Sequence, residues 1–411
     1  MFVIGSLFFV FGFVTWLNNI LIPFLKISCE LTDFQSSFVP FAFYISYFVM
    51  AIPSSYILKK TGFGNGMALG LVVMALGSIL FVPAALNRNY ILFLFGLFIQ
   101  GTGLALLQTA SNPYVTILGP VESAARRISI MGICNKIAGM IGILILYSAI
   151  FSGTEELVVF FQETTDPMLK EVLLQQLANR IILPYVVMTA VLIALVMFVK
   201  MAKLPEIHEA DESREEVSHC SIFSYPYLWL GVLALFFYVG AEVISIDYLV
   251  RYGSYNGLPL WISKNFGVYA LLALIVGYLV GIVTVPRFIS QRKALIIQLL
   301  LAIVLVMVAL TTNGLVSIVA IICLSFAHAI MWPAIWPLSI HHLGKYTELG
   351  SAFLIMAIAG GAVMPLIYGK LSDLYNPQSA YALLLVSYAY ILFFATVGCK
   401  IEKIKSGKPV L

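Results

Sequence analysis

The stretch LIIQLLLAIVLVMVAL (Leu295–Leu310) is a long apolar run without a charged residue, and MALGLVVMALGSILFVP (Met67–Pro83) has the same character. Runs of this length predict membrane-spanning helices, whereas membrane β-barrels show short segments of alternating polarity. In the whole chain 61% of the residues are hydrophobic and 10% are charged, against about 25% charged residues in soluble domains. So few charges cannot cover a water-soluble surface. The sequence therefore predicts an all-α integral membrane protein whose surrounding solvent is the lipid bilayer.

At about 20 residues per span, the apolar runs predict about twelve transmembrane helices. We expect them near residues 1–26, 34–59, 67–86, 90–118, 128–152, 181–200, 227–251, 265–286, 294–312, 315–340, 349–372 and 380–399. The first run lacks a cleavage motif, so we interpret it as a helix rather than a signal peptide. The polar stretch Thr154–Arg180 is expected to form a short amphipathic surface helix.

A second polar stretch, Leu204–Ser224, carries alternating charges and lies midway along the chain. It predicts a linker between two halves. The expected organisation is an N-terminal six-helix bundle (1–203), a cytoplasmic linker (204–225) and a C-terminal six-helix bundle (226–411).

A faint internal repeat also favours two related halves. Leu118-Gly119 recurs as Leu343-Gly344, an offset of 225 residues (118 to 343), and Ile137-Ala138-Gly139 recurs as Ile358-Ala359-Gly360, an offset of 221 (137 to 358). Transporters built from such repeats bind substrate at the interface of the halves, near the middle of the bilayer.

The distribution of basic residues predicts the orientation, because loops on the cytoplasmic side of a membrane are enriched in Lys and Arg. With both termini cytoplasmic, the inner loops carry 15 of the 23 basic residues: Lys59, Lys60, Arg126, Arg127, Lys200, Lys203, Arg214, Arg287, Arg292, Lys293, Lys345, Lys400, Lys403, Lys405 and Lys408. The termini are therefore expected to be cytoplasmic.

The sequence lacks the motifs of common enzyme classes, among them the phosphate-binding loop, HExxH, GxSxG and the dinucleotide fingerprint. Its five cysteines are scattered, with neither a disulfide framework nor metal-ligand spacing. No enzyme activity, cofactor, metal or nucleic-acid partner is expected. Without a phosphate-binding loop, uphill transport would have to use an ion gradient.

Three charged residues lie within predicted spans, where a charge costs at least about 2.5–3.5 kcal/mol and usually faces a partner or a water-filled space. They are Lys136 in the fifth span and Glu242 and Asp247 in the seventh. Glu242 lies near the middle of its span, and Asp247 is five residues further, about 140° around the helix. Glu242 is the candidate for cation coupling, with Lys136 and Asp247 as candidate partners. The alternative is a structural ion pair between the fifth and seventh helices.

Uncharged polar residues also cluster in the predicted spans. Amide side chains both donate and accept hydrogen bonds, as sugar hydroxyls require, and the aromatic faces of Trp pack against the C–H faces of a pyranose. The candidate sugar contacts are Asn19, Gln108, Asn112, Asn135 and Trp332. The alternatives are interhelical hydrogen bonds for the amides and an interfacial aromatic belt for the Trp residues. His328 is either a packing residue or a proton site.

Four stretches resemble the fucose–proton symporter family of the major facilitator superfamily, which includes glucose/galactose and N-acetylglucosamine transporters. They are LNNILIPFL (17–25), GLALLQTASNPYVTILGP (103–120), YVGAE (238–242) and LGKYTELGSAFLIMAIAGGAVMP (343–365). The resemblance implies the major facilitator fold, with twelve transmembrane helices in two pseudo-symmetric six-helix bundles. It also implies alternating access and a sugar site between the bundles.

The sequence departs from this family at the expected proton site. Where fucose permease has acidic residues in its first and fourth helices, this chain has Asn19 and Gln108, which do not titrate. The helix-5 amide is retained as Asn135, with Lys136 beside it, and Glu242 stands where fucose permease has an amide. The resemblance to the glucose/galactose and N-acetylglucosamine branches is therefore closer.

The sequence as a whole predicts a monomeric, cation-coupled sugar transporter of the bacterial inner membrane. Its expected substrate is a neutral hexose or N-acetylhexosamine, and the coupling cation is H+ or Na+. An uncoupled facilitator or exchanger and an exporter of amphipathic compounds are the alternatives.

Overall fold

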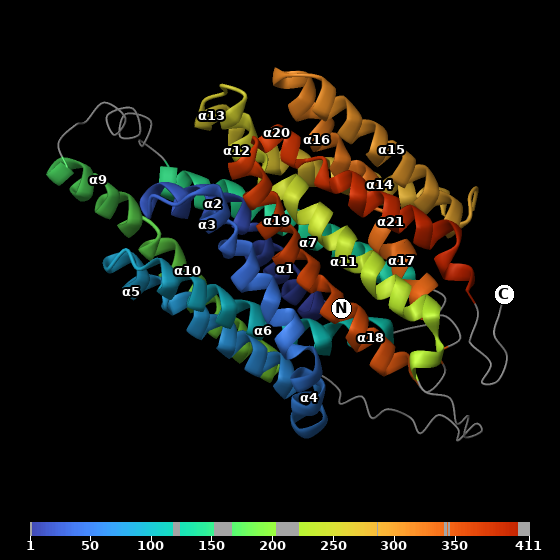
Figure 1. Ribbon diagram of the computed structural model, residues 1–411. Coiled ribbons are helices and arrows are strands. Elements are labelled where there is room, and N and C mark those ends of the chain that lie inside the picture. Colours follow the sequence, from blue (N-terminus) through green and yellow to red (C-terminus); the bar gives the residue numbers. More distant parts are fainter. Residues whose placement is uncertain are drawn as a thin grey trace.

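The structure is a computed structural model that describes residues 2–117, 124–151, 167–202, 222–285, 287–340, 343 and 346–401. Within these residues the chain is helical (Figure 1). The N-terminal half contains α1 (Phe2–Trp16), α2 (Asn18–Ser28), α3 (Asp33–Ser36), α4 (Phe38–Ile79), α5 (Phe81–Leu86), α6 (Tyr90–Ile117), α7 (Ala124–Phe151), α9 (Pro167–Asn179) and α10 (Ile182–Met201).

The C-terminal half begins with the 3-10 turn η2 (Ile222–Ser224). It continues with α11 (Pro226–Asp247), α12 (Leu249–Tyr255), α13 (Leu260–Ser263), α14 (Phe266–Thr284), α15 (Gln291–Thr311), α16 (Gly314–His328), α17 (Met331–Ile340), α18 (Thr347–Met356), η4 (Ala357–Ala359), α19 (Gly360–Leu374), α20 (Pro377–Ala380), α21 (Leu383–Thr396) and η5 (Gly398–Lys400).

Twelve helical segments are long and apolar enough to cross a membrane, which confirms the predicted helix count. They are Ile4–Ser28, Asp33–Ser54, Lys60–Leu86, Tyr90–Ser111, Ile130–Ile150, Met168–Met201, Pro226–Asp247, Leu260–Thr284, Gln291–Thr311, Gly314–Ile340, Ala352–Leu374 and Pro377–Lys400. Within the polar stretch expected to form a surface helix, α9 begins at Pro167 and most of it belongs to the sixth of these segments, whereas residues 154–166 lie outside the described part of the chain.

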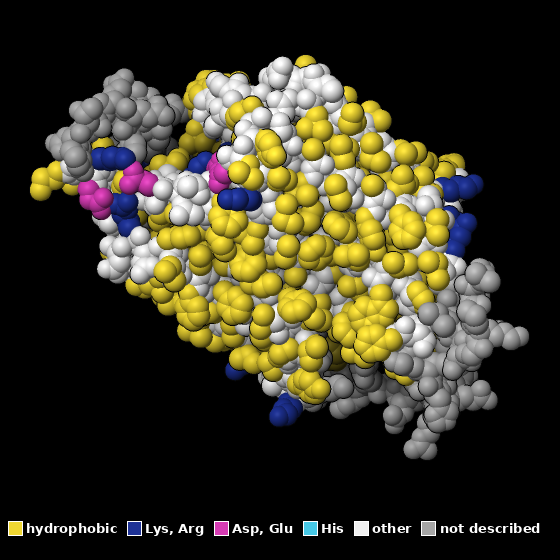
Figure 2. Space-filling view, in the orientation of Figure 1, with side chains coloured by type: hydrophobic (Ala, Val, Ile, Leu, Met, Phe, Trp, Pro, Cys, Tyr) yellow, Lys and Arg dark blue, Asp and Glu magenta, His cyan; other side chains and the backbone are white. Residues whose placement is uncertain are grey.

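Apolar side chains cover the middle of the face shown in Figure 2, whereas charged side chains gather toward its ends. Large hydrophobic residues such as Leu144, Val191, Leu300 and Val304 are exposed on the sides of the bundle. In water such exposure would be unfavourable. A belt of this kind is what a protein needs to contact lipid acyl chains.

Several membrane-spanning segments are interrupted. Gly62, at φ 76°, turns the chain within α4 near the start of the third span, a conformation that glycine adopts without a steric penalty. The first span breaks at Leu17, between α1 and α2, and the seventh ends at Asp247, where Tyr248 separates α11 from the short α12. In transporters such breaks commonly lie beside ligand and ion sites.

Glycines at two helix crossings give the sequence repeat a structural meaning. A Cβ atom on Gly12 of α1 would collide with the carbonyl oxygen of Asn135 on α7, and one on Gly360 of α19 would collide with that of Phe236 on α11. The equivalent positions are separated by 224 residues (12 to 236) and 225 residues (135 to 360). Both halves therefore contain the same close helix crossing. In the N-terminal half the glycine is on the earlier helix of the pair, α1, and in the C-terminal half it is on the later helix, α19.

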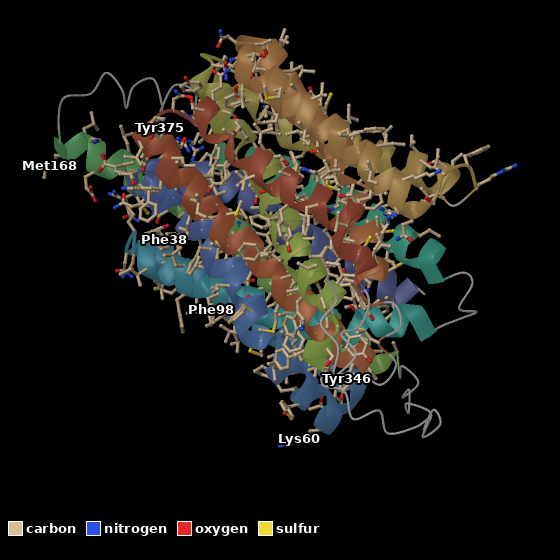
Figure 3. All side chains as sticks on the ribbon, turned by 45° about the vertical axis from the view of Figure 1, so that its right-hand side comes forward. Phe38, Lys60, Phe98, Met168, Tyr346 and Tyr375 are labelled. Carbon is tan, nitrogen blue, oxygen red and sulfur yellow. The ribbon has the colours of Figure 1, made fainter. Side chains whose placement is uncertain are left out.

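The ends of the helical bundle carry different elements. One end, hereafter the α3 end, contains α3, α12 and α20, and the other contains α18 (Figure 1). Figure 3 shows the same polarity: Phe38 and Tyr375 lie toward the α3 end, and Lys60 and Tyr346 toward the other.

Candidate functional site

Two of the three intramembrane charges lie against each other between the halves. Lys136 projects from α7 and Glu242 from α11, with 3.6 Å between Lys136 Nζ and Glu242 Oε1. Their side chains are only 10% and 12% exposed. At such burial the two charges need each other, because removing either would leave an uncompensated charge in a low-dielectric surrounding.

Lys136 has a second partner that the sequence did not reveal. Its Nζ lies 4.1 Å from the centroid of the Trp16 ring, a cation–π contact. The indole Nε1–H of Trp16 donates to Asn135 Oδ1 at 3.2 Å, and Asn135 Nδ2 is 3.5 Å from the carbonyl oxygen of Phe8. Trp16 thus positions both Lys136 and Asn135. No pattern in the sequence singled out Trp16.

Asp247, the other acid of this span, is placed differently. It is 1% exposed and is the last residue of α11, and neither carboxyl oxygen has a hydrogen-bond partner among the described residues. Lys136 and Glu242 act on it electrostatically, but the ion pair of Lys136 is with Glu242. Asp247 is therefore a buried acid whose charge has no direct partner in the described structure.

Aromatic residues extend from the seventh span into the tenth. Tyr238 lies one turn before Glu242 on α11, and its ring centroid is 6.3 Å from that of Trp332. Trp332 stacks on Trp336 at 5.4 Å, and both are half-buried. His328 is fully buried, with Nε2 2.7 Å from the Tyr388 hydroxyl and Nδ1 3.4 Å from Ser245 Oγ. Both ring nitrogens have partners, which favours the packing interpretation of His328.

The remaining candidate amides occupy α2 and α6. Gln108 is half-buried on α6, whereas the side chains of Asn19 and Asn112 lie outside the described part of the structure. Gln100 is buried and donates to Ser78 Oγ at 2.6 Å, so this amide forms an interhelical hydrogen bond. The roles of Asn19, Gln108 and Asn112 remain predictions.

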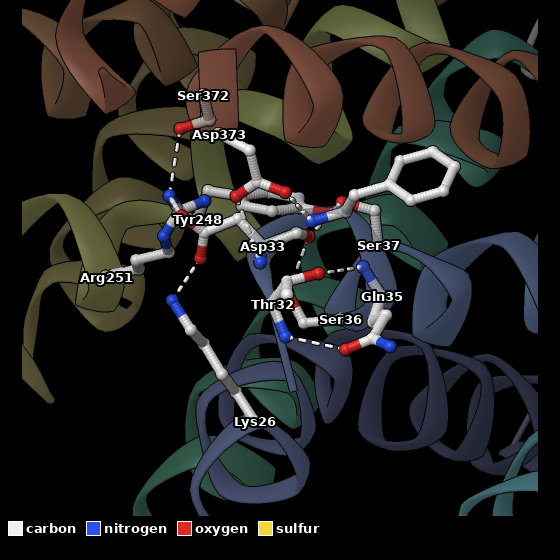
Figure 4. Close-up of polar contacts among 11 residues, drawn as sticks. Lys26, Thr32, Asp33, Gln35, Ser36, Ser37, Tyr248, Arg251, Ser372 and Asp373 are labelled. Carbon is white, nitrogen blue, oxygen red and sulfur yellow. Dashed lines mark hydrogen bonds and ion pairs between the residues drawn. The ribbon is translucent and has the colours of Figure 1, made fainter. Parts of the chain in front are cut away.

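A second group of contacts joins the halves at the α3 end (Figure 4). Asp33 of α3 forms ion pairs with Lys26 of α2 and with Arg251 of α12. Arg251 also donates to Ser372 Oγ at 2.9 Å. Burial lowers the pKa of the Arg251 guanidinium, and the nearby Tyr368 and Asp373 partly offset this effect.

Backbone and hydroxyl groups complete this group, hereafter the α3-end cluster. The carboxylate of Asp373 accepts from the amides of Asp33 at 3.1 Å and Phe34 at 2.8 Å, at the N-terminus of α3. The Tyr248 hydroxyl donates to Ser37 Oγ at 2.9 Å. A Cβ on Gly369 of α19 would collide with Ser37, so α3 and α19 are in close contact. The halves are therefore closed against each other at this end.

Sequence reasoning missed the α3-end cluster because its charges lie at helix ends, where Lys, Arg and Asp usually face solvent. Asp33 and Asp373 are 340 residues apart. Only the arrangement of the two halves brings them together.

The comparisons with known proteins agree with this fold. The sequence pattern of the Major Facilitator Superfamily matches residues 4–347. A glucose/galactose transporter of Brucella abortus is 33% identical over 401 residues, covering 96% of this chain and 92% of the relative. The L-fucose-proton symporter of Escherichia coli is 31% identical over 401 residues, covering 95% and 91%.

Among solved structures, the crystal structure of FucP in the outward conformation is similar, with a TM-score of 0.73 and 29% identity. The match covers 96% of this chain and 97% of FucP. These relatives are transporters and not enzymes. The chain belongs to the Major Facilitator Superfamily, in the group that includes glucose/galactose transporters and L-fucose-proton symporters.

Proposed function

We propose that the chain carries a neutral hexose or N-acetylhexosamine into the cell together with a cation, by alternating access between its halves. The observation that carries this proposal is the Lys136–Glu242 pair, a buried charge pair across the interface of the halves in a chain related to sugar transporters. The proposed sugar contacts are Asn19, Gln108, Asn112, Asn135 and Trp332, as expected from the sequence.

Glu242 is proposed as the coupling residue, and the described conformation is the one in which Lys136 neutralises it. Cation binding to Glu242 would release Lys136 and weaken one contact between the halves. The 3.6 Å separation supports this exchange, since Glu242 Oε1 has no shorter hydrogen bond among the described residues.

In the proposed orientation both termini are cytoplasmic and the α3 end faces outward. The described conformation would then be closed toward the outside. The boundaries of the two bundles, at residues 203 and 226, remain part of the proposal.

Uptake of a panel of radiolabelled sugars into proteoliposomes tests the function. A pH gradient and a Na+ gradient are imposed separately, with the membrane potential clamped to the same value. We expect accumulation of one sugar class above equilibrium with one gradient. Counterflow without accumulation under either gradient would instead indicate a facilitator or exchanger, and would make Lys136–Glu242 a structural pair.

A further inference from the structure

We propose that Asp247 holds a proton whenever the α3 end is closed, so that proton binding at Asp247 is the condition for closing that end. The inference rests on the proposed symport, but it concerns a second site, at the break between α11 and α12.

The first argument is that the carboxyl group of Asp247 is buried without hydrogen-bond donors. Asp247 is 1% exposed, and both of its oxygens lack a hydrogen bond from the described residues. Burying an ionised carboxylate without donors is very costly, whereas a protonated carboxyl carries no charge. The position at the C-terminus of α11 adds to this cost, because that end of a helix is partially negative.

The second argument is that nearby charges already have partners. Lys136 is paired with Glu242, and Lys26 and Arg251 are paired with Asp33. None of them forms an ion pair with Asp247 among the described residues. Compensation by a second side chain is therefore not available within the described structure, and a proton supplies it.

Several other titratable groups on the helices packed against α11 and α12 are engaged elsewhere, whereas the buried Tyr381 hydroxyl has no hydrogen-bond partner among the described residues and Tyr278 of α14 lies in the field of Glu242. His328 contacts Tyr388 and Ser245, and Asp373 accepts from the amides of α3. The Tyr368 hydroxyl donates to the carbonyl of Pro377 at 3.1 Å. Asp247 interacts electrostatically with Glu242, Lys136 and the neighbouring Tyr248, and none of the three donates a hydrogen bond to it.

The third argument links this carboxyl to the α3-end cluster. Tyr248, the next residue, donates to Ser37, and Arg251, one turn later, pairs with Asp33. Opening the α3 end must separate these contacts and move the α11–α12 break away from α3. Water would then reach Asp247 and stabilise its ionised form. Closing buries it again, which requires the proton.

The inference is tested by measuring how readily a cysteine introduced at position 37 reacts. Ser37 is fully buried at the closed α3 end, so a thiol there becomes accessible only when that end opens. The five native cysteines are replaced, Ser37→Cys is introduced, and maleimide labelling of the purified protein in detergent is followed between pH 5.5 and 8.5. The denatured protein gives the intrinsic reactivity of the thiol at each pH. We expect the corrected labelling rate to rise by about tenfold toward alkaline pH.

The Asp247→Asn change mimics the protonated acid. In that background we expect slow labelling at every pH. The matched control is the Lys136→Met/Glu242→Gln double variant, which keeps Asp247 and leaves neither charge of the central pair uncompensated, and it should keep a pH-dependent rate. Labelling that stays pH-dependent in Asp247→Asn would overturn the inference. As a second readout, the infrared band of a protonated carboxylic acid should be present at neutral pH and absent in Asp247→Asn. Its persistence in that variant would also overturn the inference.

These measurements need no sugar and no gradient, so they separate the two proposals. A wild-type protein that labels as expected but accumulates no sugar would contradict the proposed function and leave the proton site standing. Sugar accumulation in proteoliposomes, together with Ser37→Cys labelling that does not depend on pH, would support the proposed function and contradict the proton site at Asp247.

Discussion

The two places where the halves meet along the seventh span differ in how completely their polar groups are satisfied. At the α3 end, Asp33 has two cationic partners and Asp373 caps two backbone amides. Nearer the middle of the span, Lys136 and Glu242 are separated by 3.6 Å, and Asp247, between them and the α3 end, has no hydrogen bond among the described residues. Every carboxylate of the α3-end cluster has partners, although Arg251 Nη1 has none among the described residues, and these contacts hold one conformation. The carboxylates of Glu242 and Asp247 are less completely satisfied, and these are the groups that a cation can still engage.

The largest expected effect comes from Lys136→Met, which removes the base of the central pair and leaves Glu242 buried. Breaking such a pair costs about 3–5 kcal/mol, so we expect a clear drop in melting temperature in detergent and loss of sugar counterflow. The Lys136→Met/Glu242→Gln double variant should regain most of the thermal stability. A single variant as stable as the wild type would show that the pair carries little energy.

The α3-end cluster is tested next, with Asp33→Asn. This change removes the shared partner of Lys26 and Arg251, at a cost of about 2 kcal/mol, and should open the closed end. We expect Ser37→Cys labelling to become about tenfold faster at pH 6. The matched control is Glu30→Gln, which breaks an exposed ion pair with Lys170 near the same end. Exposed pairs contribute little, so equal acceleration by both changes would contradict the role of Asp33.

A smaller effect is expected from Trp16→Phe, which keeps an aromatic face for Lys136 but removes the indole donor to Asn135. Losing one hydrogen bond and part of a cation–π contact corresponds to about 1 kcal/mol. The apparent KM for sugar should therefore rise a few-fold with little change in melting temperature. An unchanged KM would show that the orientation of Asn135 does not matter for transport.

The smallest effect is expected from His328→Gln. Because both ring nitrogens bond to neighbouring hydroxyl groups, this residue is assigned to packing rather than to proton transfer. The variant should lose some thermal stability and keep the pH profile of transport. A shifted profile would add His328 to the residues of the proton pathway.

The sequence predicted the helices and the central charges for a simple physical reason. A charge within a long apolar run is too costly to be there without a partner, so Lys136, Glu242 and Asp247 stood out in the sequence alone. The pairing of Lys136 with Glu242 rather than Asp247 needed the structure, since it depends on the rotation of α7 and α11. Trp16, Asp33 and Arg251 gave no signal, because aromatic residues are common in membrane helices and charges are common at their ends.

The most direct test of the central claim compares wild type and Glu242→Gln in proteoliposomes, measuring counterflow and gradient-driven accumulation of the same sugar. The account predicts that the variant retains counterflow, since the halves can still move, but no longer accumulates sugar above equilibrium. Full gradient-driven accumulation by Glu242→Gln would contradict the assignment of this carboxylate to cation coupling.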